Sequence, residues 1–143
     1  MTTNLPPPRL VNLTSYPGLE GYSSFSPDGE QIAFTWSGEK GDNFDIYVKF
    51  VGETQAQRLT TDPAEDTYPA WSPDSRHITF LRRGQGVPSA IYWVSPLGGS
   101  ERKLLDFPAL GKMSWSPDGK WLAVARARQA SDSKDDYAGI YLI

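Results

Sequence analysis

The ten residues Trp115-Ser-Pro-Asp-Gly-Lys-Trp-Leu-Ala-Val124 place a tight turn between two apolar runs. The turn combines a serine, a proline whose φ is already set, an aspartate that can bond nearby backbone and a glycine. Such a turn joins two antiparallel strands. Similar stretches, FSPDGEQIAF at 25–34 and AWSPDSRHITF at 70–80, come earlier in the chain.

The second of the three turns departs from the pattern at its last position. Ser75 stands where the other turns have Gly29 and Gly119. Because glycine adopts left-handed backbone angles more easily than serine, we expect this turn either to use a different backbone or to store strain.

The three turns repeat with a regular period. Ser26, Ser72 and Ser116 are separated by 46 and then 44 residues. A period near 45 residues is typical of β-propellers, in which each repeat forms one blade of about four strands. The sequence therefore predicts an all-β propeller with three blades, formed by residues of about 22–60, 68–105 and 112–143.

The residues that follow each turn alternate with the period of a β-strand. In the first copy, Ile32, Phe34 and Trp36 alternate with Gln31, Ala33 and Thr35. Large residues on one face and small ones on the other suit blades that stack face to face. The twelve expected strands are residues 10–14, 22–25, 30–36, 45–50, 56–60, 68–71, 76–82, 90–94, 101–105, 112–115, 120–126 and 138–143.

The first expected strand, 10–14, matches the fourth strand of the next repeat, whereas the third repeat has no fourth strand of its own. Propellers have about four to eight blades, so three blades leave two faces open. We expect a six-bladed homodimer in which strand 10–14 completes the last blade of the ring. A fragment of a longer propeller, or a higher oligomer, is the alternative.

These residues resemble the TolB-type, or PD40, propeller repeats, whose signature is an apolar residue, Ser-Pro-Asp-Gly, an apolar run and then Asp-Ile-Tyr. The matching segments are Phe25–Phe34 with Asp45–Tyr47, Trp71–Phe80 with Ile91 and Tyr92, and Trp115–Val124 with Ile140 and Tyr141. The resemblance covers the chain after Pro8. Ala90 and Gly139 replace Asp45 in the later copies, which argues against a ligand role for that aspartate.

The N-terminal half is also similar to the C-terminal sensor region of bacterial membrane-bound winged-helix regulators and Ser/Thr kinases. The resemblance implies a parent protein with a membrane anchor, a propeller in the periplasm and a proline-rich linker, here residues 1–8. The alternative interpretation of residues 1–8 is an ordinary tail. No winged helix or kinase is encoded in this segment.

Bulk composition restricts the classes of function. A formal net charge of −3 and a pI near 5.1 offer no basic face, so we expect no direct binding to nucleic acid. The chain has no cysteine, which excludes disulfides and zinc-thiolate sites. No apolar run approaches the roughly 18 residues of a membrane helix, so we expect a soluble segment without membrane contact.

Candidate catalytic and metal-binding groups are few. His77 is the sole histidine, and its place within an alternating strand favours a packed or rim side chain over a base. There is no Gly-x-Ser-x-Gly nucleophile motif. The segments 84–90 and 96–100 contain glycines but predict hairpin ends, not phosphate loops.

Three acidic clusters invite a calcium hypothesis, but none has EF-hand spacing, and we interpret them as solvated loop charge. They comprise Asp42 and Asp45; Asp62, Glu65 and Asp66; and Asp132, Asp135 and Asp136. Five tryptophans in alternating strands are expected in the core, with Trp93 the least certain. They are Trp36, Trp71, Trp93, Trp115 and Trp121.

The sequence therefore predicts no catalytic residue, no cofactor and no metal site, and it does not assign ligand-binding residues. The leading hypothesis is a non-catalytic binding or sensor domain of a bacterial signalling protein, which recognises an unknown protein, peptide or ligand. The alternatives are a substrate-gating propeller of a prolyl-oligopeptidase-type hydrolase and a purely self-assembling structural module.

Overall fold

The computed structural model describes residues 6–129, 132–134 and 137–143, and all of its regular elements are β-strands. The strands are β1 (Glu20–Phe25), β2 (Gln31–Trp36), β3 (Asp45–Phe50), β4 (Gln57–Arg58), β5 (Glu65–Trp71), β6 (Ile78–Arg83), β7 (Ala90–Val94), β8 (Arg102–Asp106), β9 (Ser114–Trp115), β10 (Leu122–Arg126) and β11 (Gly139–Leu142). In the described part of the chain, no helix has the length and apolar character needed to cross a membrane.

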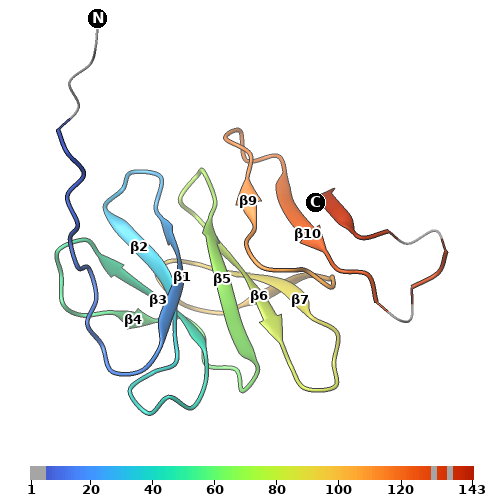
Figure 1. The fold of residues 1–143 in the computed structure, drawn as a ribbon, viewed down its shortest axis with the longest axis horizontal. Helices are drawn as coiled ribbons and strands as arrows, with labels where there is room; N and C mark the ends of the chain where they lie inside the picture. Colours follow the sequence, from blue (N-terminus) through green and yellow to red (C-terminus); the bar gives the residue numbers. More distant parts are fainter. Residues whose placement is uncertain (1–5, 130–131, 135–136) are drawn as a thin grey trace, which may run out of the picture.

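The strands form three antiparallel sheets that follow one another along the chain (Figure 1). Blade one has the order β1-β2-β3-β4, blade two has β5-β6-β7-β8, and blade three has β9-β10-β11. Strand β5 contacts β1, β2 and β3 of the preceding blade, and β9 lies against β5. The predicted all-β propeller architecture is confirmed, whereas the six-bladed ring stays a prediction.

Each Ser-Pro-Asp turn is closed by its own side chains. In the first turn, the Ser26 hydroxyl donates to the Asp28 carboxylate at 2.6 Å and accepts the Gln31 backbone N–H at 2.8 Å. The Glu30 N–H also donates to Asp28. The second and third turns repeat the same bonds, so the sequence motif specifies the turn through local hydrogen bonding.

Ser75 adopts the left-handed backbone that its neighbours reach with glycine. Its φ is 61°, compared with 75° for Gly29 and 70° for Gly119. Of the two expected outcomes, the structure therefore has the strained one, since this backbone conformation has a higher free energy for a residue with a Cβ than for glycine.

Each blade presents two different faces to its neighbours. The upstream face, towards the preceding blade, carries Ile32 and Phe34 in blade one, and the residues at equivalent positions are Ile78 and Phe80 in blade two and Leu122 and Val124 in blade three. The downstream face, towards the following blade, carries Ala33, Ile46 and Val48 in blade one and Leu81 and Ile91 in blade two.

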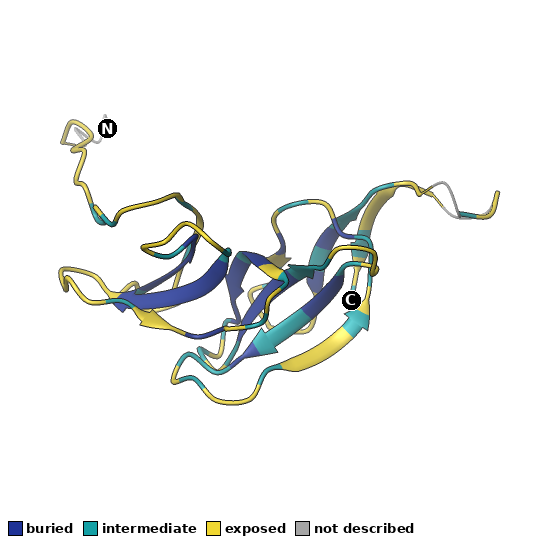
Figure 2. Ribbon diagram, turned by 90° about the horizontal axis from the view of Figure 1, so that it is seen from below, coloured by how far each residue is buried: buried dark blue, intermediate teal, exposed yellow. Residues whose placement is uncertain are grey.

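Two hydrophobic cores lie where a downstream face meets an upstream face. Between blades one and two, Ile46 and Val48 pack with Ile78 and Phe80. Between blades two and three, Leu81 and Ile91 pack with Leu122 and Val124. Buried residues gather between the sheets, and loops are exposed (Figure 2). The predicted alternation of faces is confirmed.

Residues 10–14 do not form the predicted strand. They have no strand partner in the described chain, and Leu10 is fully exposed. A β-strand needs a neighbour to satisfy its backbone, and within one chain the open edge of blade three belongs to a different sheet. Leu13 and Tyr16 instead pack on the upstream face of blade one.

Candidate inner-rim binding site

The first strand of each sheet lies at the inner side of the blade stack. Strands β1 and β5 contact each other, and β5 contacts β9 (Figure 1). The register between β1 and β2 shifts between Gly21 and Ser24, and that between β5 and β6 shifts between Thr67 and Ala70. Each inner strand therefore carries a bulge, a feature that re-aims side chains and is common near functional sites.

A tyrosine occupies the same position in both bulges. Tyr22 and Tyr68 lie 46 residues apart, the period of the repeat, and have φ values of 46° and 57°. A bulky residue in this region costs on the order of 1–3 kcal/mol. The same strained backbone thus occurs at two equivalent positions. This recurrence makes Tyr22 and Tyr68 candidate functional residues.

The two tyrosines form one continuous surface with a cation. Their ring centroids are 4.1 Å apart, and the Arg83 guanidinium lies 5.7 Å from the centroid of the Tyr68 ring. Arg83 also donates to the Ala109 carbonyl at 3.2 Å. Gly111, with φ of 69°, also lies beside the Tyr68 ring, since a Cβ at this position would be 3.8 Å from Tyr68 Cε1. We call Tyr22, Tyr68, Arg83 and Gly111 the inner rim.

The inner rim is accessible and chemically mixed. Tyr22 is 46% exposed, and both Tyr68 and Arg83 are half-buried. The hydrogen bond with Tyr22 and, to a smaller extent, partial burial raise the pKa of Tyr68. Exposed tyrosine and arginine are the residue types most enriched in the energetic centres of protein interfaces.

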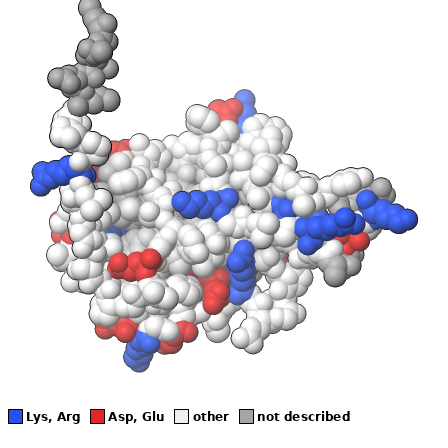
Figure 3. Space-filling model, viewed as in Figure 1, with Lys and Arg blue, Asp and Glu red and all other residues white. Residues whose placement is uncertain are grey.

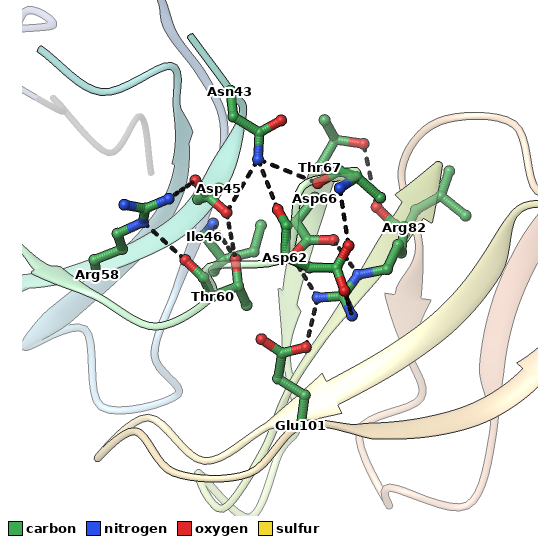
Figure 4. A network of polar contacts seen from close by, with 12 residues as sticks. Asn43, Asp45, Ile46, Arg58, Thr60, Asp62, Asp66, Thr67, Arg82 and Glu101 are labelled. Carbon is green, nitrogen blue, oxygen red and sulfur yellow. Dashed lines mark hydrogen bonds and ion pairs between the residues drawn. The ribbon is translucent and has the colours of Figure 1, made fainter. Parts of the chain in front are cut away.

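A separate polar network joins blades one and two (Figure 4). Arg82 donates two hydrogen bonds of 2.7 Å to the buried Asp66 carboxylate, one from Nε and one from an Nη atom. It also contacts Asp62 at 3.2 Å and Glu101 at 2.5 Å. Three carboxylates therefore surround one guanidinium, which leaves Arg82 occupied as a structural cation.

The neighbouring Asp45 is also buried at this junction. It accepts from Arg58 at 2.6 Å and from the Thr60 hydroxyl at 3.3 Å. Asn43 links the two halves of the network by donating to Asp45 and to the carbonyls of Asp62 and Ala64. The network fixes the crossover between the blades through side-chain bonds to backbone.

Burial dominates the ionisation of both aspartates. Desolvation raises the pKa of Asp66 to about 6, against the opposing effect of Arg82. It also raises the pKa of Asp45, although Arg58 and Thr60 act in the other direction.

The interpretation of the acidic clusters as solvated loop charge is wrong for part of them. Asp45 and Asp66 are fully buried, because they lie where two sheets meet, and the side chain of Asp132 is covered by its ion pair with Arg126. Asp42 and Glu65 are exposed as expected. Asp135 and Asp136 lie outside the described residues.

No group of three or more acidic, histidine or cysteine side chains in the described segments is arranged to hold a metal ion. Lysines, arginines and acidic residues are interspersed on the face drawn in Figure 3, and no large field of one sign covers it.

His77 lies in a pocket of about 400 Å³ between the second and third turns. Its ring packs edge-on against Trp93, with centroids 4.1 Å apart. Ser72 and Asp74 line the same pocket, but the Ser72 hydroxyl donates to Asp74 at 2.5 Å instead of to the imidazole. The three residue types of a catalytic triad are therefore close together without its hydrogen-bond order.

The tryptophans divide between core and surface. Trp36 and Trp71 are buried, and Trp115 is half-buried against the core between blades two and three. Trp93 is half-buried beneath Arg102. Trp121 is 50% exposed, so the expectation of a core position is wrong for this residue.

Sequence reasoning missed the inner rim. The signal that could have found it is the recurrence of tyrosine at positions 22 and 68, in phase with the turns. A tyrosine in a strand ordinarily suggests core packing, and only the bulges, the positive φ values and the contact between the two rings distinguish these tyrosines from core residues.

Comparisons with known proteins agree with the propeller fold. Residues 4–140 match the family model described as the Tricorn protease N-terminal beta propeller domain. The crystal structure of TolB from Acinetobacter baumannii is similar, with 29% identity, a TM-score of 0.72, and coverage of 91% of this chain and 31% of that one. No match was found among curated proteins.

Two further structures share the fold. TolB from Agrobacterium tumefaciens has 23% identity and a TM-score of 0.71, with coverage of 90% of this chain and 47% of that one. The β-propeller domain of the Trilobed protease from Pyrococcus furiosus has 17% identity and a TM-score of 0.53, with coverage of 87% and 40%.

The chain thus spans between about a third and a half of the length of these structures. Its family match covers almost all of its residues, and its repeats, blade order and turns agree with that match. The chain belongs to the family of the Tricorn protease N-terminal beta propeller domain.

Proposed function

We propose that this chain is a non-catalytic binding module that recognises a protein or peptide partner through the inner rim. The observation that carries the proposal is the pair of strained tyrosines, Tyr22 and Tyr68, at equivalent positions in consecutive blades. Their rings and the Arg83 guanidinium form a preformed surface on rigid strands. Such a surface binds without ordering long side chains, which lowers the entropic cost of association.

The absence of catalysis is part of the same proposal. The Ser72 hydroxyl is bonded to Asp74, and His77 packs on Trp93, so the nearest approach to a triad in the described residues lacks an activated nucleophile. Arg82 is surrounded by three carboxylates. Incubation with chromogenic ester and peptide substrates should give only the background rate, and turnover lost in a His77→Ala variant would contradict the proposal.

A displayed peptide library tests the binding role directly. The wild-type domain is immobilised for selection, and the double variant Tyr22→Ser and Tyr68→Ser is the counter-target. Peptides that bind the wild type and lose at least tenfold in affinity on the variant are expected. A Leu97→Ser variant, at an exposed turn far from the rim in sequence, is the matched control.

Failure to select any peptide, or selection of peptides that bind the rim variant equally well, would reject this site. A small molecule that raises the melting temperature of the wild type but not of the rim variant would reassign the rim from peptide recognition to ligand sensing.

The place of the module in a bacterial signalling protein, with the propeller in the periplasm, is also a proposal and is supported by the sequence resemblance alone. An upstream membrane helix following a winged-helix or kinase domain in the full gene would support it. A downstream α/β-hydrolase domain would instead favour a gating propeller.

A further inference from the structure

The downstream face of blade three is open. Ile140 lies at the position that Ile46 and Ile91 occupy in the preceding blades. Those two isoleucines are fully buried by the next blade, whereas Ile140 is 74% exposed, and Leu142 on the same face is 60% exposed. The internal blade junctions thus show what covers this face elsewhere in the molecule: the upstream face of another blade.

The edge of blade three is open as well. Blades one and two each have four strands, but the described part of blade three has three, and β11 pairs only with β10. In blade one the corresponding edge is covered by β4, where Tyr47 pairs with Arg58 and Val48 with Gln57. An exposed strand edge with apolar neighbours is a ready template for pairing with another chain.

The N-terminal segment already follows the path of an inter-blade crossover. Residues 13–20 correspond to residues 59–66 with the 46-residue offset. The Thr14 hydroxyl donates to Glu20 at 2.7 Å, as Thr60 bonds Asp66 in the crossover between blades one and two. Leu13 packs on blade one as Leu59 packs in the core between blades one and two.

Other contacts hold this segment firmly against the upstream face. The Tyr16 ring stacks on Trp36 with centroids 4.8 Å apart, and the Trp36 indole N–H donates to the Pro17 carbonyl at 2.7 Å. The backbone passes so close that a Cβ on Gly18 would lie 2.7 Å from the Ser37 hydroxyl. Blade one therefore presents the second half of a blade junction, with its crossover in place.

From these complementary halves we infer that two copies of this chain close a ring. The downstream face of blade three in one copy covers the upstream face of blade one in its partner, and residues 11–13 of the partner add a strand to β11. The register of blade one sets the pairing: Val11 lies opposite Leu142, and Asn12 lies opposite Tyr141. The same contact made twice by a two-fold axis leaves no blade edge open.

The occupant is a second copy because this chain itself carries both halves of the junction. A blade from a longer polypeptide would compete for the same face and is an outcome of the test. The assembly is independent of the inner rim, whose residues lie on β1, β5 and β6 and in the segment between β8 and β9 and take no part in the new contact.

The mass in solution tests the inference. Light scattering of the chain at tens of micromolar should give twice the single-chain mass of 15.9 kDa. The double variant Ile140→Asp and Leu142→Asp should give 15.9 kDa with an unchanged circular dichroism spectrum, because both side chains are exposed in the single chain. Leu97→Asp, which places the same charge at a turn of blade two that is 86% exposed, should keep the doubled mass.

A second variant tests the other half of the contact. Removal of residues 1–11 deletes Val11, 67% exposed, and leaves Leu13 and Tyr16 on blade one; this variant should also fall to a single-chain mass. A single-chain mass for the wild type, a mass above two chains, or a doubled mass that survives both variants would overturn the inference. If the wild type has a single-chain mass and forms a complex only when a separate propeller blade is added, the face belongs to such a blade instead.

Discussion

One difference between the two blade junctions leads to a quantitative prediction. Between blades two and three, the Trp115 indole N–H donates to the Thr79 hydroxyl at 3.2 Å, and Thr79 donates to the Ala70 carbonyl at 3.1 Å. At the junction of blades one and two, the residue in the place of Thr79 is Ala33, and the buried Trp71 indole N–H has no hydrogen-bond partner among the described residues.

The Ala33→Thr substitution should supply the missing acceptor. Ala33 pairs with Ser24 across β1 and β2, as Thr79 pairs with Ala70 across β5 and β6. The new hydroxyl can therefore donate to the Ser24 carbonyl and accept from Trp71. Because Ala33 is fully buried, the added atoms also carry a packing cost.

Ala33→Val is the matched control, because valine has almost the shape of threonine and no hydroxyl, so the packing cost cancels in the comparison. A hydrogen bond contributes about 1 kcal/mol net. The threonine variant should exceed the valine variant in free energy of unfolding by about 1 kcal/mol, which corresponds to about 3 °C in Tm for a chain of this size. If the hydroxyl found no partner, its burial would reverse the sign and cost about 1–3 kcal/mol.

Urea unfolding followed by tryptophan fluorescence measures this difference. The slope of free energy against urea should be equal in both variants, so that the midpoint reports stability alone. The Trp71 indole proton should also move downfield in the NMR spectrum of the threonine variant only. A valine variant as stable as, or more stable than, the threonine variant would refute the assignment of Ala33 as the missing acceptor position.

Three further predictions concern the turns and the buried aspartate. Ser75→Gly should gain up to about 1 kcal/mol by relieving the left-handed strain, and Gly119→Ser should lose about as much; equal melting temperatures would contradict this. Ser72→Ala should cost about 1–3 kcal/mol, since it removes two hydrogen bonds at a buried turn, and chemical denaturation measures the loss. The folded state holds the Asp66 proton to about pH 6 instead of its ordinary 3.8, so this group should lower stability by about 2 kcal/mol as pH rises from 4 to 7. Asp66→Asn should remove this part of the slope, and an unchanged pH profile would rule out Asp66 as its source.

Local chemistry explains which features of the fold could be predicted from the sequence. The Ser-Pro-Asp turns use bonds within five residues of one another, and the alternation of large and small residues is a property of each strand alone. The turns and the alternation therefore do not depend on how the strands are arranged in the tertiary structure. The blade repeat and the family resemblance therefore followed from the sequence, and the structure and the family match agree with them.

The features that could not be predicted depend on contacts between distant parts of the chain. Residues 10–14 have strand-like sequence, but a strand forms only beside a partner, and one chain offers none in reach. Asp45 and Asp66 look like loop charges until two sheets enclose them with Arg58 and Arg82. The exposure of Tyr22 depends on a bulge that hydrophobic periodicity does not reveal.

Consecutive blades place equivalent residues on one inner side, and the contact between Tyr22 and Tyr68 is the sharpest test of this arrangement. Their ring centroids are 4.1 Å apart although the residues are separated by one full repeat. Nuclear Overhauser spectroscopy on the wild-type chain with specifically labelled tyrosines should show a strong cross-peak between the two rings. Well-resolved ring signals without that cross-peak would contradict the blade stacking on which the inner rim depends.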